Sequence, residues 1–324
     1  MTACSAQPSA DADYNAVDTG TLVVVNKGDA TATLIDLASG ATLATLPTGN
    51  GPHEVAVSRS GRWAVVADYG AGSDGQTLTL IDVAKLSVAM TIDLGRYRRP
   101  HGIAFVPADT AVLVTSESAR AVALVSIPAG NVLGAIPTEQ GGSHMLALGA
   151  GRLYTSNMQS GTVSEMDVAN REFLRTFEVD GQPEAIGATL DGSDVWVGSN
   201  ARGTVSAIDP ASGRVRVVAT GFEFPYRIYM SPDPDQARVF IPDLRANSLR
   251  VFERKSGKEL GVIDLPGGGP ESLTSGGTGE ALYLSLTRQA RVAVIDMNSF
   301  EVTGYLPTGD RPDGIGWSPL VVDR

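Results

Sequence analysis

The sequence repeats one short pattern seven times, and this repeat constrains the fold more than any other feature. In each copy a turn containing Gly or Pro precedes a polar residue and a short apolar run. The polar positions, which we call the anchor positions, are His53, His101, His144, Glu184, Tyr226, Glu271 and Asp313. Successive anchor positions lie 40 to 48 residues apart. A period of this length is typical of the blades of a β-propeller.

A second series recurs with the same period. Short apolar strands end at polar residues that lie 41 to 46 residues apart, namely Asp36, Asp82, Ser126, Asp167, Asp209, Glu253 and Asp296. Hairpin turns such as Ala38-Ser39-Gly40 follow these ends, so we interpret the acids as caps that bond nearby backbone amides. Each repeat therefore holds four short strands. The sequence predicts an all-β fold, a seven-bladed β-propeller with four antiparallel strands per blade.

The two ends of the chain should complete one blade between them. Three strands, within residues 21–46, precede the first anchor position, and one strand, residues 313–318, comes last. We therefore expect the ring to be closed by a seventh blade that combines three N-terminal strands with one C-terminal strand. Residues 21–324 then form a single domain without an internal linker.

Charge and apolar content exclude several classes of protein. The 324 residues include 25 Lys and Arg against 36 Asp and Glu, a formal net charge of -11, and 43% are hydrophobic. An acidic chain disfavours general nucleic-acid binding, because Lys and Arg are needed to neutralise phosphates. The apolar content excludes a disordered chain. No apolar run approaches the ~18–20 residues that span a bilayer. We expect a monomer.

The single cysteine, Cys4, excludes an internal disulfide. Thr2-Ala3-Cys4-Ser5 resembles the end of a bacterial lipobox, and residues 5–18 are rich in Ala, Ser, Asp and Pro. We therefore expect residues 1–20 to be a lipobox remnant and flexible tether. The protein would then be an exported periplasmic or outer-membrane-anchored lipoprotein that meets the membrane only through a lipid on Cys4. The alternative is a disordered start with a chance cysteine.

The second strand of each repeat also ends at a polar residue. These residues are Asn26, Asp68, Glu117, Asn157, Asn200, Asp243 and Thr287. Together with anchor segments such as Pro52-His53-Glu54-Val55-Ala56-Val57, these strands resemble the YVTN family of secreted bacterial propellers over residues 21–318. The resemblance implies the fold. It implies no single activity, because propellers of this kind include ligand-binding proteins, lactonases, lyases and cofactor-handling proteins.

The three histidines of the chain occupy three consecutive anchor positions, His53, His101 and His144. In a propeller the anchor strands are innermost and run the same way along the central channel, so the anchor residues should form a ring at one end of it. Converging imidazoles beside carboxylates can bind Zn, Mn, Fe or Cu. We therefore predict a divalent transition-metal site on these histidines. The alternative is that the imidazoles bond the backbone of neighbouring blades.

The remaining ring residues suggest acid–base chemistry. Glu184, Tyr226 and Glu271 are the candidate catalytic residues, each as a proton donor or acceptor. The candidate oxygen ligands for a bound molecule are Asp313, Asp68, Asn157 and Asn200. The last three loosely resemble residues of gluconolactonase-like propellers. The alternatives are solvated acids and structural turn caps.

Basic residues lie next to two anchor positions. Arg98 and Arg99 precede His101, and Arg227 follows Tyr226. Guanidinium groups suit carboxylates and phosphates, so these arginines are candidate ligand-binding residues for a small anionic molecule. The alternative is a solvated loop that pairs with nearby acids. The chain has no P-loop or Rossmann glycine pattern in a suitable context, so we expect neither a nucleotide nor a flavin.

Three functions follow from these residues. The first is an exported propeller that binds a metal ion, a small anionic ligand or both at the channel end. The second is a metal-dependent lyase or lactonase acting on an acidic or sugar-derived substrate. The third is a protein-interaction platform that uses the blade surfaces.

Overall fold

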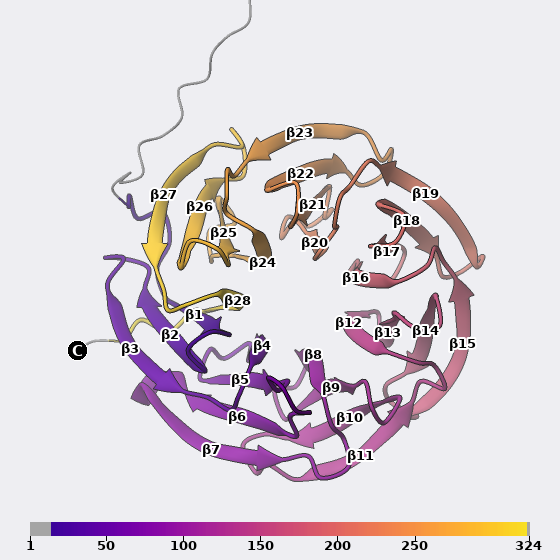
Figure 1. The fold of residues 1–324 in the computed structure, drawn as a ribbon, viewed down its shortest axis with the longest axis horizontal. Coiled ribbons are helices and arrows are strands. Elements are labelled where there is room, and N and C mark those ends of the chain that lie inside the picture. Colours follow the sequence, from indigo (N-terminus) through magenta and orange to yellow (C-terminus); the bar gives the residue numbers. More distant parts are fainter. Residues whose placement is uncertain (1–13, 323–324) are drawn as a thin grey trace, which may run out of the picture.

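The computed structural model of the chain describes residues 14–322 and shows a ring of seven blades around a central axis (Figure 1). Each blade is a four-stranded antiparallel sheet whose first strand lies innermost. We number the blades from the first complete one: blade 1 is β4–β7, and blade 7 combines β28 with β1–β3. The predicted all-β, seven-bladed propeller is confirmed. Cys4 lies outside the described residues.

The strands of blades 1 to 3 are β4 (Pro52–Val57), β5 (Trp63–Asp68), β6 (Thr77–Asp82), β7 (Ser87–Asp93), β8 (Pro100–Phe105), β9 (Ala111–Ser116), β10 (Ala121–Ser126), β11 (Val132–Pro137), β12 (Ser143–Gly149), β13 (Arg152–Asn157), β14 (Thr162–Asp167) and β15 (Glu172–Glu178). Those of blades 4 and 5 are β16 (Pro183–Ala188), β17 (Val195–Ser199), β18 (Thr204–Asp209), β19 (Arg214–Thr220), β20 (Tyr229–Met230), β21 (Arg238–Asp243), β22 (Ser248–Glu253) and β23 (Glu259–Asp264). Those of blades 6 and 7 are β24 (Pro270–Ser275), β25 (Ala281–Leu286), β26 (Arg291–Asp296), β27 (Val302–Pro307), β28 (Pro312–Ser318), β1 (Thr21–Asn26), β2 (Thr31–Asp36) and β3 (Thr42–Pro47). One short 3-10 turn, η1 (Val83–Lys85), interrupts this pattern between β6 and β7.

The blades are held together by apolar clusters between their faces. In one cluster Val65 and Leu80 of blade 1 pack with Val112 and Val125 of blade 2, and all four are buried. A sheet that is covered on both faces needs apolar residues at successive positions rather than at alternate ones. Strand β1 shows this directly, since all six of its residues are buried. No helix in the described part of the chain has the length and apolar character needed to cross a bilayer.

The acids that end the third strands cap turns, as the sequence indicated. Asp36 accepts hydrogen bonds from the amides of Ala38 and Ser39, at 3.2 and 3.1 Å. Asp296 accepts them from Asn298 and Ser299, at 2.8 and 2.7 Å. These bonds satisfy amides that the hairpin leaves unpaired.

Blade 5 departs from the regular pattern. Its inner strand β20 has only two residues, and Tyr226 and Arg227 precede it instead of lying in it. The segment still follows the neighbouring strand, because the amide of Tyr226 bonds the carbonyl of Pro242 at 2.9 Å. Arg227 donates a side-chain bond to the Tyr226 carbonyl at 2.7 Å. Arg227 therefore lies outside the regular ladder of blade 5, and its side chain is buried.

The ring closes through blade 7, as predicted. Strand β28 pairs antiparallel with β1, and Thr21 lies opposite Ser318. The segment before β1 adds a second contact between the chain ends, because buried Asp18 accepts bonds from the amide and hydroxyl of Thr278, both at 2.8 Å. The hydroxyl of Tyr283 donates to the same carboxylate at 3.1 Å. The N-terminal segment therefore binds blade 6 as well as blade 7.

Replacing Asp18 tests this second contact. Asp18→Ala should lower the free energy of unfolding by about 1–3 kcal/mol, because buried donors lose their acceptor. The measurement is chemical denaturation followed by circular dichroism, and Asp264→Ala, at an exposed acid, is the control. An Asp18→Ala midpoint equal to that of the unaltered protein would contradict the proposed contact.

Candidate functional site

The anchor residues lie at one end of the central channel, which we call the histidine end. In several blades the start of the inner strand pairs with the end of the second strand, as Pro52 does with Asp68 and Ser143 with Asn157. The anchor residues and the polar residues that end the second strands therefore lie at the same end of the channel. The inner strands that carry them surround the axis in Figure 1.

The three histidines and Tyr69 form one aromatic cluster. The ring centroids of His101 and His144 are 3.8 Å apart at an interplanar angle of 33°, and those of His53 and His101 are 5.0 Å apart. Tyr69 lies 4.6 Å from His53 and meets His101 edge-on at 5.0 Å. The imidazoles therefore stack along the channel wall.

Carboxylates on both sides hold His144 in its charged form. Its Nδ1 donates to Glu117 at 2.5 Å, and its Nε2 lies 3.6 Å from Glu184. Burial alone would lower the pKa of His144, but the two carboxylates outweigh burial and raise this pKa to about 9. Burial and the neighbouring charge of His144 instead lower the pKa of His101 well below its usual value. A charged imidazole thus stacks on a neutral one.

The stacked geometry does not fit the predicted metal centre. Residues 14–322 contain no group of three His, Cys, Asp or Glu side chains placed to hold a metal ion. Both nitrogens of His144 face carboxylates, and Nδ1 of His101 lies 3.3 Å from the sulfur of Met145. Metal binding needs free, neutral nitrogen donors. The metal site on His53, His101 and His144 stays a prediction.

Arg227 is buried inside the channel rather than exposed at its end. It donates to Glu54, and its Nη1 lies 3.6 Å from Glu184. Its guanidinium carbon lies 4.1 Å from the ring centroid of Tyr226. Burial raises the pKa of Glu54, and Arg227 opposes that rise. Arg227 therefore neutralises carboxylates within the channel instead of standing free to clamp a ligand.

A second charged group surrounds Asp313, which is completely buried. Lys27 Nζ lies 2.7 Å from Glu271 and 3.2 Å from Asp313, and His53 Nδ1 lies 3.3 Å from Asp313. Burial would raise the pKa of Asp313, but Lys27, His53 and Arg227 lower it below its usual range. Burial and the Asp313 charge raise the pKa of Glu271 well above its usual value. The two acids thus have pKa values that are shifted in opposite directions, although Lys27 contacts both.

Arg99 and Arg98 differ in their surroundings. The Nε of Arg99 donates to Glu117 at 2.8 Å, and its guanidinium carbon lies 4.2 Å from the ring centroid of Tyr69. Arg98 has an exposed side chain, while its carbonyl accepts hydroxyl bonds from Ser116 and Ser118 at 2.7 and 2.8 Å. Arg99 therefore joins the aromatic cluster, whereas the Arg98 side chain points to solvent.

Two of the three candidate oxygen ligands at the ends of second strands, Asp68 and Asn157, have side-chain oxygens that are bonded within the protein. Asp68 accepts bonds from the hydroxyls of Thr77 and Thr79, both at 2.9 Å. Burial, opposed by these hydroxyls, raises the pKa of Asp68 to about 6. Asn157 donates to two hydroxyls of its own blade, and its Oδ1 accepts the hydroxyl of Ser143 at 2.9 Å. Asn200 donates to Glu184, while its buried Oδ1 has no hydrogen-bond partner among residues 14–322. Asp68 and Asn157 thus stabilise their blades, and Asn200 positions Glu184.

The groups that reach solvent at the histidine end are mainly cationic or aromatic. The side chains of Arg99, His53 and Lys27 are 37%, 22% and 16% exposed, whereas Glu271 and Asp313 are buried beneath them. The loops at this end join second to third strands and each blade to the next. They carry ten Lys and Arg against seven Asp and Glu. This end is therefore more basic than the chain as a whole.

Sequence reasoning assigned no role to four residues of this site, Lys27, Glu54, Tyr69 and Glu117. Two of them, Lys27 and Tyr69, directly follow a polar strand end, and Glu54 follows an anchor histidine. Glu117 was placed at a strand end without a function. A systematic check of the residue after each polar position would have found Lys27, Glu54 and Tyr69.

Comparison with known proteins shows the fold alone. No protein-family model matches the chain, and no curated protein matches it. Among solved structures it is similar to hydrazine synthase of Kuenenia stuttgartiensis, with 18% identity, a TM-score of 0.71, and 83% of this chain and 90% of that one covered. It is also similar to a functionally unknown protein of Desulfotomaculum acetoxidans, with 16% identity, a TM-score of 0.76, and coverage of 93% and 99%.

A third similar structure is a putative 6-phosphogluconolactonase of Bacteroides fragilis. It has 15% identity and a TM-score of 0.71, and the match covers 94% of this chain and 99% of that one. Identities this low establish a shared propeller fold and no shared activity. The YVTN family assignment stays a prediction.

The raised pKa of His144 predicts a pH-dependent contribution to stability. The folded pKa, about 9, lies above the ordinary value of 6.5, so this contribution is complete below about pH 6.5 and is lost as the pH rises through about 9. The stability advantage of the unaltered protein over His144→Gln should therefore fall by about 3 kcal/mol across this interval. Urea denaturation at several pH values measures it. A difference that stays constant from pH 6 to pH 10 would show that His144 is not held as an imidazolium.

Proposed function

We propose that this propeller is a binding protein for a small molecule that carries a carboxylate, and that the molecule binds at the histidine end. The observation that carries the proposal is the arrangement of charge there. Lys27, Arg99 and His53 reach solvent, while the carboxylates of Asp313 and Glu271 lie beneath them. An approaching anion therefore meets the cations of Lys27 and Arg99 before the buried acids.

The aromatic cluster adds a second means of recognition. Tyr69 and His53 offer ring faces and edges against which a planar ligand can pack. The cations, however, already have partners, since Arg99 bonds Glu117 and Lys27 bonds Glu271. The net binding free energy is therefore only the difference between the contacts that the ligand makes and the contacts within the protein that it replaces. We therefore expect modest affinity, in the micromolar to millimolar range.

Titration calorimetry with uronates and short carboxylic acids tests the proposal. Affinity should fall as salt rises, because the attraction is screened. Arg99→Gln should weaken binding by about 1–3 kcal/mol, the range for a charge-assisted hydrogen bond. The control is Arg59→Gln, at an exposed arginine in a loop at the opposite end of the channel. Neutral analogues that bind as well as the acids, or an Arg99→Gln protein with unchanged affinity, would refute the proposal.

A second candidate is a metal-dependent lyase or lactonase. One observation favours it: Glu271, with its raised pKa, lies in the same ion-paired group as ionised Asp313, and neighbouring carboxyl groups with separated pKa values are typical of acid–base catalysis. Burial and Asp313 also raise the pKa of Tyr226 well above its usual value. Tyr226 therefore stays protonated at neutral pH, where it can donate a hydrogen bond but gives up its proton less readily than an ordinary tyrosine. The putative lactonase of Bacteroides fragilis shares this fold.

Metal content and turnover separate the two candidates. Protein purified without a histidine tag should bind the carboxylate equally well before and after treatment with a chelator, because the histidines are stacked and paired. The readouts are elemental analysis, calorimetry and pH-stat hydrolysis of sugar lactones. One equivalent of Zn, Mn, Fe or Cu that is lost in His101→Ala, together with hydrolysis that is lost in Glu271→Gln, would establish the enzyme instead.

A further inference from the structure

Strand β19, the outer strand of blade 4, differs in charge from the other six outer strands. It carries Arg214 and Arg216 and no acidic residue. The other outer strands carry no charged residue at all or more acidic than basic residues. β19 is thus the one basic outer strand in a chain whose net charge is -11.

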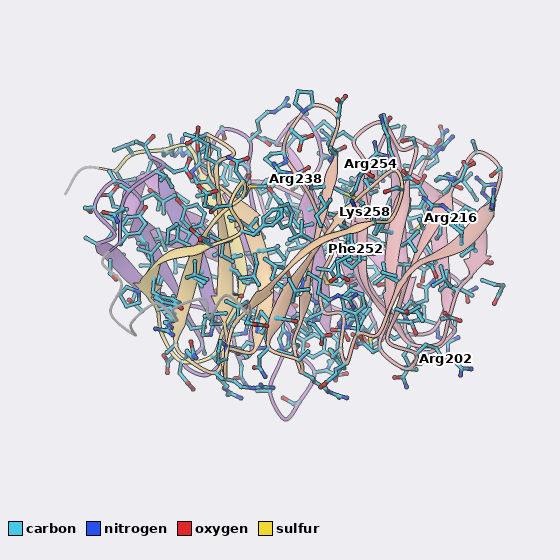
Figure 2. All side chains as sticks on the ribbon, turned by 90° about the horizontal axis from the view of Figure 1, so that it is seen from above. Arg202, Arg216, Arg238, Phe252, Arg254 and Lys258 are labelled. Atoms are coloured by element: carbon cyan, nitrogen blue, oxygen red, sulfur yellow. The ribbon has the colours of Figure 1, made fainter. Side chains whose placement is uncertain are left out.

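A basic turn of the next blade lies against this strand. The turn between β22 and β23 is Arg254-Lys255-Ser256-Gly257-Lys258. A Cβ atom placed on Gly257 would lie 3.2 Å from the carbonyl oxygen of Val218 in β19. The outer wall of the ring carries Lys258 close to Arg254, with Arg216 further along (Figure 2). The strand and the turn therefore bring basic groups of blades 4 and 5 together, with the acids Glu253 and Glu259 on either side of the turn.

Arg216 faces the same way as this turn. It pairs across the ladder with Ala207, and residues directly opposite each other in an antiparallel ladder point to the same face. Ala207 packs in the apolar cluster that contains Phe252 of blade 5. The Arg216 side chain thus lies on the blade 5 face of the sheet, where the turn is.

Three of the basic groups have no acidic partner in the described part of the chain. Within residues 14–322 no carboxylate lies within ion-pair distance of Arg216, Lys255 or Lys258. Arg254 differs, because it is buried and bonds Asp194 at 2.6 Å. Lys255 and Lys258 are exposed, and Arg216 is half-buried. Val217, the next residue of β19, is 55% exposed and points to the opposite face of the sheet from Arg216. Exposed cations and an exposed apolar residue along one strand edge are typical of a site that binds another molecule.

The backbone of β19 is also open to pairing. β19 ends its sheet, so its outer edge has no neighbouring strand. A register shift sets Val218 apart, which leaves Arg214–Val217 as the regular part of the edge. An edge strand of this kind can accept a further strand through main-chain hydrogen bonds. No acidic side chain of β19 itself would repel a negatively charged strand.

We propose that β19 and the turn 254–258 form a docking site for an acidic, extended peptide segment of a partner protein. The segment adds as a fifth strand of blade 4 beside Arg214–Val217. Alternate acidic side chains of the segment then reach Arg216, Lys255 and Lys258, and the apolar residues between them cover Val217. This site is separate from the channel and does not depend on the ligand proposed there.

Binding of a labelled peptide tests the proposal. The peptide alternates Glu and Val, and a second peptide has the same composition with its Glu and Val residues in separate blocks. Fluorescence anisotropy should show the alternating peptide binding more tightly, with an affinity that falls as salt rises. Charge reversal in Lys255→Glu/Lys258→Glu should weaken binding at least tenfold. If the charge reversal impairs folding, the neutral variant Lys255→Gln/Lys258→Gln replaces it in the binding measurement. A thermal melt of each variant checks that it is folded.

The matched control is Lys85→Glu/Arg171→Glu, which reverses two charges in the equivalent turns of blades 1 and 3 and should leave binding unchanged. Hydrogen exchange should show new protection of the amides in Arg214–Val217 when the peptide binds. Equal binding to the reversed protein, or binding without that protection, would overturn the proposal. Binding to vesicles of anionic phospholipid without binding to the peptide would overturn it in favour of a membrane surface. The absence of binding to either probe would also overturn it.

Discussion

The histidine end of the channel depends on one buried charge, the guanidinium group of Arg227. Removing a cation from water costs several kcal/mol unless anions replace the lost hydration. Glu54 and Glu184 meet this requirement, and the Tyr226 ring covers one face of the guanidinium. Arg227 precedes the short strand β20, so the buried charge lies where the inner edge of blade 5 is irregular.

Contacts from Arg227 lead outward to the surface of the site. Glu184 lies next to His144, His144 donates to Glu117, and Glu117 bonds Arg99. Each carboxylate thereby separates two cations that would otherwise repel each other. The carboxylates of Glu184 and Glu117 are paired with cations below the surface. This pairing explains how an acidic protein presents cations at one end of its channel. It also explains why His144 holds its proton while the adjacent His101 does not.

The fold could be predicted from the sequence because propeller blades repeat in sequence as well as in space. Spacing alone located the blades and their closure by β28, and the acid at each strand end indicated its turn, as Asp36 shows. The ring of anchor residues followed from the direction of the inner strands. Spacing, however, carries no information on where side chains point.

Contacts between blades were therefore the part that sequence reasoning missed. Glu54 and Arg227 are 173 positions apart in the chain and meet only because the ring closes. The stacking of His101 on His144 likewise joins two blades, because His101 lies in β8 and His144 in β12. The structure pairs His144 with Glu117 and Glu184, contacts that spacing could not reveal. The metal centre that the sequence indicated stays a prediction.

A double-mutant cycle between Arg227 and Glu54 tests most directly whether this buried pair holds the site together. The free energy of unfolding is measured for Arg227→Met, for Glu54→Met and for the protein with both changes. Each single change should cost about 3–5 kcal/mol, because it leaves an unpaired charge in the channel. The double change should cost no more than either single change, because both charges are then gone. Costs that simply add would show that the two groups act independently and would contradict this account of the channel.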